Sequence, residues 1–157
     1  MEEQRLFCTF RVNGRLFGVD ILDVKEVTAE TTYTSVAHAP DEVLGLVNIR
    51  GHIYLALDLR RLLGMPATNV TIDSRLVLFK TSVGSAFGVV VDEISEIQTA
   101  DSNRIEAFTQ NDHETAATNV RRVDLIDAVC KLAGELLIVL NPRRFLAVVE
   151  QNLDAIS

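Results

Sequence analysis

Short runs of apolar residues, separated by polar turn residues, recur along the whole chain. The clearest pair covers residues 44–49 and 53–57, which are rich in leucine and β-branched residues and flank a polar turn at Gly51. Runs of this length, bounded by turn residues, predict a hairpin of two largely buried strands, and glycine provides the backbone freedom that a tight connection needs. Asp58 then lies where a helix N-cap belongs, ahead of a short helix that we expect to end at Gly64.

The pattern of strands and turns occurs twice, and such a repeat bears directly on the architecture. Residues 6–27 align with 76–97 at a shift of 70 without a gap, and residues 51–63 align with 134–146 at a shift of 83. The larger second shift means that the second copy contains additional residues. We place them in the polar stretch 101–120, which we predict to be a loop.

Two copies of this kind, each with about five short strands and one short helix, suit two small closed barrels better than a sandwich of long strands. We therefore predict a mainly β fold in a single domain, residues 1–157, with barrel halves at roughly 6–70 and 71–146. Because each half is small for an independent fold, we expect the halves to share an apolar interface. Apolar spacings of three and four predict a C-terminal helix over 142–154 that packs on the barrels, capped by Asn141.

The repeat also separates residues kept for the fold from residues that are free for another role. Gly51 and Asp58 of the first copy are matched by Gly134 and Asn141 in the second copy. We interpret these four residues as structural turn and cap positions, because both copies need the same tight turn and the same helix start.

The polar residues around Gly51 differ between the copies. Lys131 and Ala133 stand in the second copy where the first has Asn48 and Arg50. A turn that keeps its glycine but changes its polar neighbours has released those side chains for another use, so recognition of a partner is the functional interpretation of Arg50. The structural alternative is that Arg50 is a solvated turn residue.

Composition and charge restrict the possible partners. The 157 residues are 48% hydrophobic and 24% charged, which is ordinary for a globular protein, and the net charge is −7. An acidic balance disfavours nucleic acid and anionic membranes, because both favour a basic surface. No apolar run approaches the roughly 20 residues of a membrane span, and we expect no signal peptide. Cys8 and Cys130 lie in separate apolar runs, so we predict buried core cysteines and a cytoplasmic protein.

No arrangement of side chains predicts catalysis or cofactor binding. The three histidines, His38, His52 and His113, lie in different segments without a ligand spacing, so we predict no metal site. The serines lack the G-x-S-x-G context of a nucleophile. Gly84 and Gly88 lie in a predicted hairpin, and a phosphate-binding glycine pattern precedes a helix. We therefore expect a protein that is not an enzyme and that needs no cofactor.

Several motifs in consistent order resemble those of the CheW family. The sequence G-x-x-N-x-R-G over residues 45–51, followed by an apolar strand and D-L-R, resembles the family signature. Matches to the family's two barrel motifs and to its last strand lie at residues 17–21, 24–27, 87–92 and 137–141. The resemblance extends from Leu6 to about Val149, which is nearly the whole chain.

This resemblance implies a fold and a class of function. CheW-like proteins consist of two SH3-like five-stranded β-barrels, and they are scaffolds without catalytic activity. They couple chemoreceptors to the histidine kinase CheA in bacterial chemotaxis. The implied partners are the helical tip of the receptor's cytoplasmic part and the regulatory domain of the kinase. The implied location is the cytoplasm, with recruitment to membrane-associated receptor arrays.

The resemblance also implies a set of receptor-binding residues. The corresponding positions here are Val24, Glu26, Gly45, Asn48 and Arg50. Glu26 and Arg50 match an acidic and basic pair of the family, which would orient Arg50. The repeat supports a special role for Arg50 but is neutral on Glu26, because the second copy also has glutamate at the equivalent position.

Three departures from the family pattern concern the identity of the receptor. Leu55 stands where the family often has proline, Thr28 where it often has a basic residue, and His38 where asparagine is more usual. Two alternative functions stay open. One is a CheW-like adaptor of a non-flagellar pathway, such as twitching motility or surface sensing. The other is a ligand-binding regulatory domain.

Overall fold

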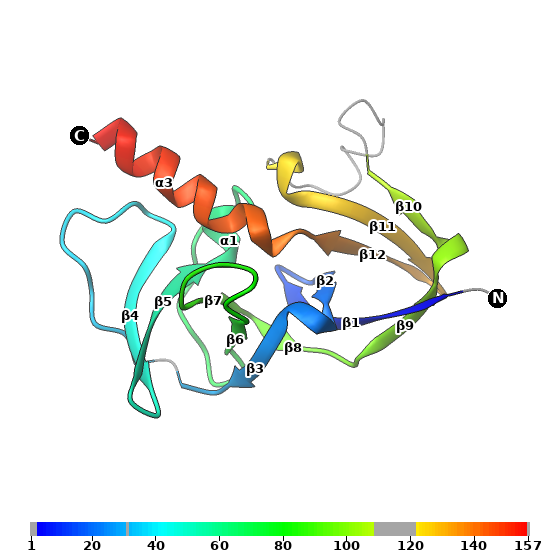
Figure 1. The fold of residues 1–157 in the computed structure, drawn as a ribbon, viewed down its shortest axis with the longest axis horizontal. Helices are drawn as coiled ribbons and strands as arrows, with labels where there is room; N and C mark the ends of the chain where they lie inside the picture. The colour runs from blue at the N-terminus through cyan, green and yellow to red at the C-terminus, as the bar shows by residue number, and fades with distance from the viewer. Residues whose placement is uncertain (1–2, 31, 109–121, 157) are drawn as a thin grey trace.

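The strands form two sheets in the computed structural model, which describes residues 3–30, 32–108 and 122–156 (Figure 1). The five-stranded sheet, called barrel 1 below, has the order β3-β6-β7-β5-β4, with bounds Val24–Thr28 (β3), Val43–Ile49 (β4), His52–Asp58 (β5), Arg75–Phe79 (β6) and Phe87–Val91 (β7). The seven-stranded sheet, called barrel 2, contains Gln4–Val12 (β1), Arg15–Asp20 (β2), Glu93–Ile94 (β8), Gln98–Asp101 (β9), Ile105–Ala107 (β10), Ile126–Leu132 (β11) and Glu135–Leu140 (β12). The fold is mainly β, as the apolar pattern predicts.

Barrel 2 has seven named strands in six strand positions. Strands β8 and β9 pair with successive parts of β1, so together they occupy one position. A single 3-10 turn, η2 (Ser102–Arg104), joins β9 to β10, and β10 pairs with β11 at the opposite edge of the sheet. The chain from β8 to β10 therefore closes the barrel.

Part of the polar stretch 101–120 was predicted wrongly as a loop. Residues 101–107 form the end of β9, the turn η2 and strand β10. Ile105 packs against the core of barrel 2, and this contact together with the pairing to β11 outweighs the polar composition of the segment. Residues 109–121 lie outside the described residues.

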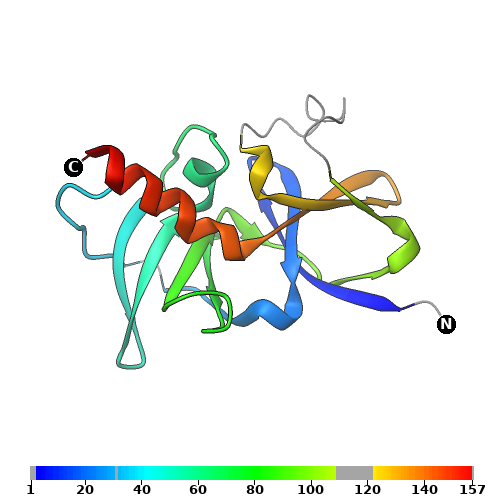
Figure 2. The same cartoon turned by 45° about the horizontal axis from the view of Figure 1, so that its top comes forward.

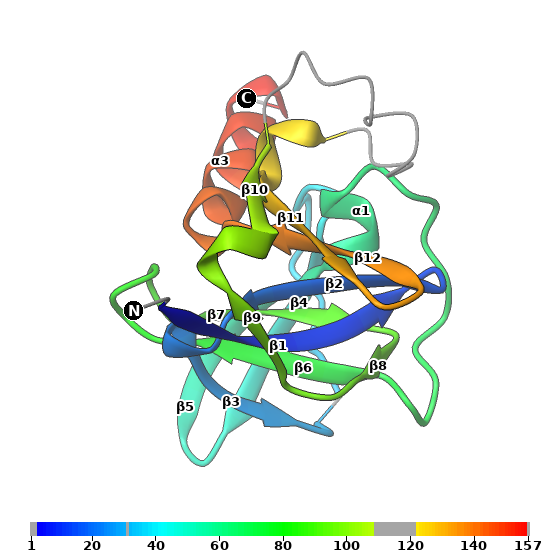
Figure 3. The same cartoon turned by 90° about the vertical axis from the view of Figure 1, so that its right-hand side faces the viewer.

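The two barrels do not follow the predicted halves 6–70 and 71–146. Barrel 1 is built from residues 24–91, and barrel 2 is built from residues 4–20 together with 93–140. Each barrel therefore combines the first hairpin of one repeat with the later strands of the other repeat (Figure 3). Because the two first hairpins carry the same apolar pattern, exchanging them buries the same faces, and the local sequence does not distinguish the two arrangements.

The exchange relates the two repeats by an approximate two-fold symmetry. In barrel 2, Phe17 of β2 lies opposite Ile138 of the parallel strand β12. In barrel 1, Phe87 of β7 lies opposite Leu55 of the parallel strand β5. Phe87 is the repeat equivalent of Phe17 at the shift of 70, and Leu55 corresponds to Ile138 at the shift of 83. Positions in one barrel can therefore be compared directly with their equivalents in the other.

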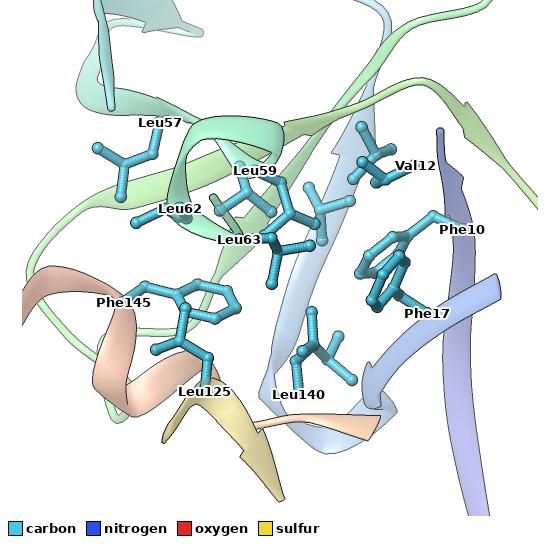
Figure 4. Close-up of a cluster of buried hydrophobic side chains, with 14 of the residues drawn as sticks. Phe10, Val12, Phe17, Leu57, Leu59, Leu62, Leu63, Leu125, Leu140 and Phe145 are labelled. Carbon is cyan, nitrogen blue, oxygen red and sulfur yellow. The ribbon is translucent and has the colours of Figure 1, made fainter. Parts of the chain in front are cut away.

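Within the described residues, buried apolar side chains form three clusters. One fills barrel 1 and contains Val47, Ile49, Tyr54, Ala56, Leu76, Leu78 and Val90. A second fills barrel 2 and contains Phe7, Leu16, Ala100, Ala128, Cys130, Leu137 and Val139. The largest, called the inter-barrel core, takes residues from both barrels and from helices α1 (Leu59–Leu62) and α3 (Phe145–Ile156), among them those labelled in Figure 4. The expectation of a shared apolar interface is confirmed.

Both cysteines are buried and free, as predicted. Cys8 belongs to the inter-barrel core and Cys130 to the core of barrel 2. Burial raises the pKa of both thiols, so both stay protonated and apolar at neutral pH.

A helical segment follows the last strand of each repeat. Helix α1 (Leu59–Leu62) begins after Asp58, whose Oδ1 accepts a hydrogen bond of 3.0 Å from the Arg60 amide. In the second repeat, Asn141 accepts a 3.1 Å bond from the Arg143 amide, and this cap starts the 3-10 turn η4 (Pro142–Arg144). Both caps satisfy amides that have no partner within the helical turn.

Helix α3 (Phe145–Ile156) continues directly from η4 and places Phe145, Val148 and Val149 in the inter-barrel core. It runs from the junction of the barrels over barrel 1 (Figure 2). There Asn152 donates a hydrogen bond to the buried carboxylate of Glu42. The apolar face predicted from the sequence thus holds the helix across the junction.

Repeated arginines join each helix start to the end of a neighbouring strand. Arg60 binds Asp92 through two hydrogen bonds of 3.0 and 2.6 Å, and Arg143 binds Asp23 through two of 2.9 Å. Arg60 and Arg143 are repeat equivalents at the shift of 83, and both acids follow the second strand of a repeat. We call these two interactions the arginine clamps. Bidentate pairs of this kind fix geometry as well as adding stability.

We expect acid to weaken the fold in part through the clamp at Asp92. Burial acts to raise the pKa of Asp92, but hydrogen bonds from the Arg60 guanidinium and the Asn13 amide outweigh it, so the pKa lies below its usual value. Such a carboxylate stabilises the folded state above the unfolded pKa of about 3.9, and this contribution is lost as the pH falls through the folded pKa. In urea unfolding between pH 7 and 3, the stability difference between the protein and Asp92→Asn should shrink on acidification. A difference independent of pH would contradict this role.

Candidate functional site

The turn between β4 and β5 has a strained backbone that holds two polar side chains in place. Arg50 and Gly51 are its central residues, and their φ angles are +50° and +85°. Two positive φ angles in a two-residue connection are typical of a type I′ turn, whose twist matches that of the flanking strands. The Asn48 side chain accepts a 2.9 Å hydrogen bond from the Gly51 amide. The Asn48 side chain therefore stabilises the turn that presents Arg50.

Arg50 forms the ion pair with Glu26 that the family resemblance implies. Its Nη2 contacts Oε1 of Glu26 on β3, at the opposite edge of the barrel 1 sheet from β4. The Arg50 side chain is 71% exposed and that of Glu26 is 24% exposed. The hydrogen bond and the charge of Glu26 raise the pKa of Arg50, so the guanidinium stays charged. Among the described residues, Glu26 is the one hydrogen-bond partner of this cation, and the exposed side chain leaves further N–H donors toward solvent.

A second contact joins the same two elements. Lys25 Nζ donates a 2.8 Å hydrogen bond to the hydroxyl of Tyr54 on β5 and lies 5.5 Å from the centre of the Tyr54 ring. Strand β3 is thus tied to the β4–β5 hairpin by neighbouring side chains at two positions. These ties keep Glu26 and Arg50 in a defined relative position.

Gly45 is buried in the barrel wall, in strand β4. Its φ is +148°, and a Cβ at this position would overlap the carbonyl oxygen of Thr34. Thr34 and Leu46 exchange two backbone hydrogen bonds of 2.8 Å, which close the free edge of β4. The structure therefore explains glycine at this position by the close approach of two backbones.

The five predicted receptor-binding residues occupy different environments. Glu26 and Arg50 are in contact, and Asn48 supports the turn beside them. Val24 is half-buried, packs against the inter-barrel core and pairs with a residue of β6. Gly45 is buried in β4. The structure thus brings three of the five together at one end of barrel 1.

Two exposed apolar residues on the β4–β5 hairpin that carries Arg50 were not predicted. Leu46 of β4 is 39% exposed and Ile53 of β5 is 52% exposed, and Ile53 lies directly opposite Asn48 in the hairpin. Both lie on the outward face, where alternation within an antiparallel sheet ordinarily places polar side chains. Assigning alternate residues of these two strands to the inward and outward faces would have predicted that Leu46 and Ile53 are exposed. We call Glu26, Leu46, Asn48, Arg50 and Ile53 the hairpin surface.

The predicted turn and cap residues have the geometry of those roles. Gly51 and Gly134 have φ of +85° and +88° in equivalent hairpins. Asp58 and Asn141 each accept a hydrogen bond from the amide two residues ahead. A substituted residue at either glycine would meet no neighbouring atom, so these glycines are there for their backbone angle alone.

Across residues 3–30, 32–108 and 122–156, no group of three or more His, Cys, Asp or Glu side chains is placed to hold a metal ion. Within the same described ranges, none of the helices has the length and apolar character to cross a membrane. The hairpin surface combines a fixed cation, an exposed amide and two apolar side chains on one hairpin, a combination chemically suited to contact with another protein.

Comparison with known proteins identifies relatives over the whole fold. The family described as CheW-like domain matches residues 6–150. The chain is 36% identical over 103 residues to the chemotaxis protein CheW of Rhizobium meliloti (strain 1021), a match that covers 65% of each protein. It is 25% identical over 134 residues to the chemotaxis protein CheW of Bacillus subtilis (strain 168), covering 80% of this chain and 85% of that one.

A solved structure has the same fold. The scaffolding protein TtCheW from Thermoanaerobacter tengcongensis superposes with a TM-score of 0.76 at 24% identity, over 88% of this chain and 89% of that chain. This likeness agrees with the arrangement of two barrels described above. The family match, which spans nearly the whole chain, decides the classification: the chain belongs to the CheW family.

Proposed function

We propose that this protein is a non-catalytic adaptor that couples chemoreceptors, the methyl-accepting chemotaxis proteins, to a CheA-type histidine kinase. The observation that carries the proposal is Arg50, an exposed cation that Glu26 orients on a strained, supported turn in a chain of the CheW family. Strained backbone at an exposed polar residue is a common property of functional sites. The adaptor would act in the cytoplasm and be recruited to membrane-associated receptor arrays.

The hairpin surface suits the helical tip of a receptor. Leu46 and Ile53 offer apolar contact area, and Arg50 has free donors for a carboxylate or a backbone carbonyl. A helix that presents an apolar stripe with polar flanks matches this combination. Asn48 and Gly45 would then support recognition indirectly, by holding the turn and the edge of β4.

The coupling role requires a second, separate surface for the regulatory domain of the kinase. An exposed sheet edge can pair with another β domain, and β8 and β10 are the edge strands of the barrel 2 sheet. One molecule that binds two partners at separate patches raises their effective concentration relative to each other. No chemistry at the protein itself is needed for this effect.

Calorimetric titration with the regulatory domain of a CheA-type kinase from the same organism tests the coupling role. We expect saturable binding with a Kd in the micromolar range or below. A folded sample that releases or absorbs no heat of binding over this range would contradict the proposal, whatever the receptor result.

We expect Arg50→Glu to weaken receptor binding at least about tenfold. The substitution removes the exposed donors and places a second carboxylate beside Glu26, and unfavourable charge placement at an interface is costly. The affinity for the kinase regulatory domain and the melting temperature should stay the same, because the side chain is exposed. Titration of a soluble receptor hairpin against the protein and the variant measures the change.

Arg15→Glu is the matched control for this charge reversal. Arg15 is an exposed arginine that follows the Asn13–Gly14 turn of barrel 2, a hairpin turn that also has two positive φ angles. The substitution Arg15→Glu changes the net charge by the same amount as Arg50→Glu, but it leaves the hairpin surface intact. Equal loss of receptor affinity in both variants, or no loss in Arg50→Glu, would remove the assignment of Arg50.

A further inference from the structure

A cavity of about 430 Å³ opens on barrel 2, away from the hairpin surface. The end of β2 and the turn η1 (Ile21–Asp23) form one wall, and the turn η4 before α3 forms another. Its charged and polar lining residues are Arg5, Asp20, Asp23, Ser82, Asp127, Asn141 and Arg143. Leu22 also lines it and is 70% exposed.

The charges in this cavity do not balance. Arg5 pairs with Asp20 at 3.1 Å, and Arg143 pairs with Asp23 in one of the arginine clamps. The fifth charged residue, Asp127, is exposed and has no ion-pair partner within the described part of the chain. One negative charge is therefore left without compensation.

Barrel 1 contains the equivalent of this cavity. At the shift of 83, Leu44, Asp58 and Arg60 correspond to Asp127, Asn141 and Arg143. The agreement extends to backbone detail, because the strand pairing shifts register at Leu44 in β4 and at Asp127 in β11. The two cavities are thus the same feature of the fold in two copies.

The equivalent cavity in barrel 1 is filled by the chain itself. Only about 20 Å³ remains there, because Thr68, Asn69 and Val70 line it together with Ser74. In the second repeat the chain that follows Arg143 forms α3 instead, which runs over the inter-barrel core and leaves the cavity open. A short irregular segment of chain is therefore an occupant of the right shape for this place.

The lining also changes between the two copies. The apolar residues Leu44 and Val90 of barrel 1 are replaced by Asp127 and Asp20 in barrel 2, at the shifts of 83 and 70. An apolar filler such as Val70 would remove water from Asp127, which has no ion-pair partner, whereas Asp20 would keep its pair with Arg5. A cationic side chain with an aliphatic stem satisfies both the free carboxylate and the exposed Leu22.

We infer that this cavity binds a lysine or arginine side chain carried by a short extended segment of a partner protein. The ammonium or guanidinium pairs with Asp127, the aliphatic stem lies on Leu22, and the backbone of the segment takes the place that residues 68–70 occupy in barrel 1. This site goes beyond the proposed adaptor function and is independent of it. It is lined by none of the residues of the hairpin surface.

Amide NMR of the ¹⁵N-labelled protein with two peptides tests the inference. The first is an acetylated and amidated tetrapeptide Thr-Lys-Val-Thr, and the second has norleucine in place of lysine. We expect the lysine peptide to shift the amides of Asp20, Leu22 and Asp127 in a saturable way, with the norleucine peptide causing no saturable shift. We expect Asp127→Asn to weaken the lysine peptide about fivefold, the upper range for a solvent-exposed ion pair.

Asp73→Asn is the control, because Asp73 is an exposed aspartate in the loop before β6, outside the cavity. It should leave the affinity for the lysine peptide unchanged. Equal binding of the two peptides, equal affinity of Asp127→Asn and the protein, or shifts confined to Glu26 and Arg50 would each overturn the site. An unchanged titration with the kinase regulatory domain in Asp127→Asn would show that the two functions are separate.

Discussion

Replacing Gly45 by alanine is expected to lower the free energy of unfolding by about 3 kcal/mol or more. The new Cβ would overlap the carbonyl oxygen of Thr34, so either β4 or the segment at Thr34 must move. Movement breaks the two backbone hydrogen bonds between Thr34 and Leu46, each worth about 1 kcal/mol net, and the positive φ adds roughly 1–2 kcal/mol of strain. Urea unfolding followed by circular dichroism measures the loss.

The variant Gly51→Ala measures the cost of a positive φ without a steric overlap. Gly51 also has a positive φ, but a Cβ there would meet no atom within 4 Å. We expect this control to cost only the strain, about 1–2 kcal/mol. If Gly45→Ala cost no more than Gly51→Ala, the close approach at Thr34 would not be what requires glycine. Receptor affinity should fall in Gly45→Ala as well, because the edge of β4 leads directly into the turn at Arg50.

Local features of the fold were predictable because they depend on neighbours in the sequence. The hairpin turn at Gly51, the cap at Asp58 and the start of the last helix after Asn141 each involve residues within about four positions of one another. Turn and capping preferences act over this range. The repeat strengthened each prediction, since the same local solution occurs twice.

The exchange of hairpins between the barrels was not predictable in this way. It depends on which of two similar hairpins pairs in parallel with β5 and which with β12. Phe17 and Phe87 are each followed by the dipeptide Gly-Val in equivalent apolar runs, so the pattern of apolar residues is equally satisfied by either choice. The strand β10 was missed for a similar reason, because its partner β11 lies on the other side of residues 109–121.

The residues of the candidate site were likewise predicted only in part. The pairing of Glu26 with Arg50 followed from the family resemblance, and the repeat had already singled out Arg50. The apolar neighbours Leu46 and Ile53 were missed, because apolar runs were interpreted as buried strands without separating their two faces. The open cavity on barrel 2 required the structure, since its meaning comes from comparing two places about 80 residues apart in sequence that occupy equivalent positions.

The exchanged hairpins also predict how the protein unfolds. Neither barrel can be completed without strands from both repeats, and the inter-barrel core takes residues from both sheets. Phe17 and Phe87 lie fully buried in this core, at equivalent positions of the two repeats. We therefore expect one cooperative unfolding transition for the whole chain.

Phe87→Ala should lower the stability by about 3–5 kcal/mol, the usual cost of truncating a buried phenylalanine. The ring lies 5.1 Å from that of Phe79, which in turn contacts the ring of Phe145 in α3, so the cavity would form where β6, β7 and α3 meet. Phe17→Ala, in the other barrel, should shift the same single transition by a similar amount. Phe87→Leu is the conservative control and should cost less, because leucine fills part of the space. Urea unfolding followed at several probes would contradict the shared core if Phe87→Ala produced two separate transitions, with barrel 2 unfolding as in the unsubstituted protein.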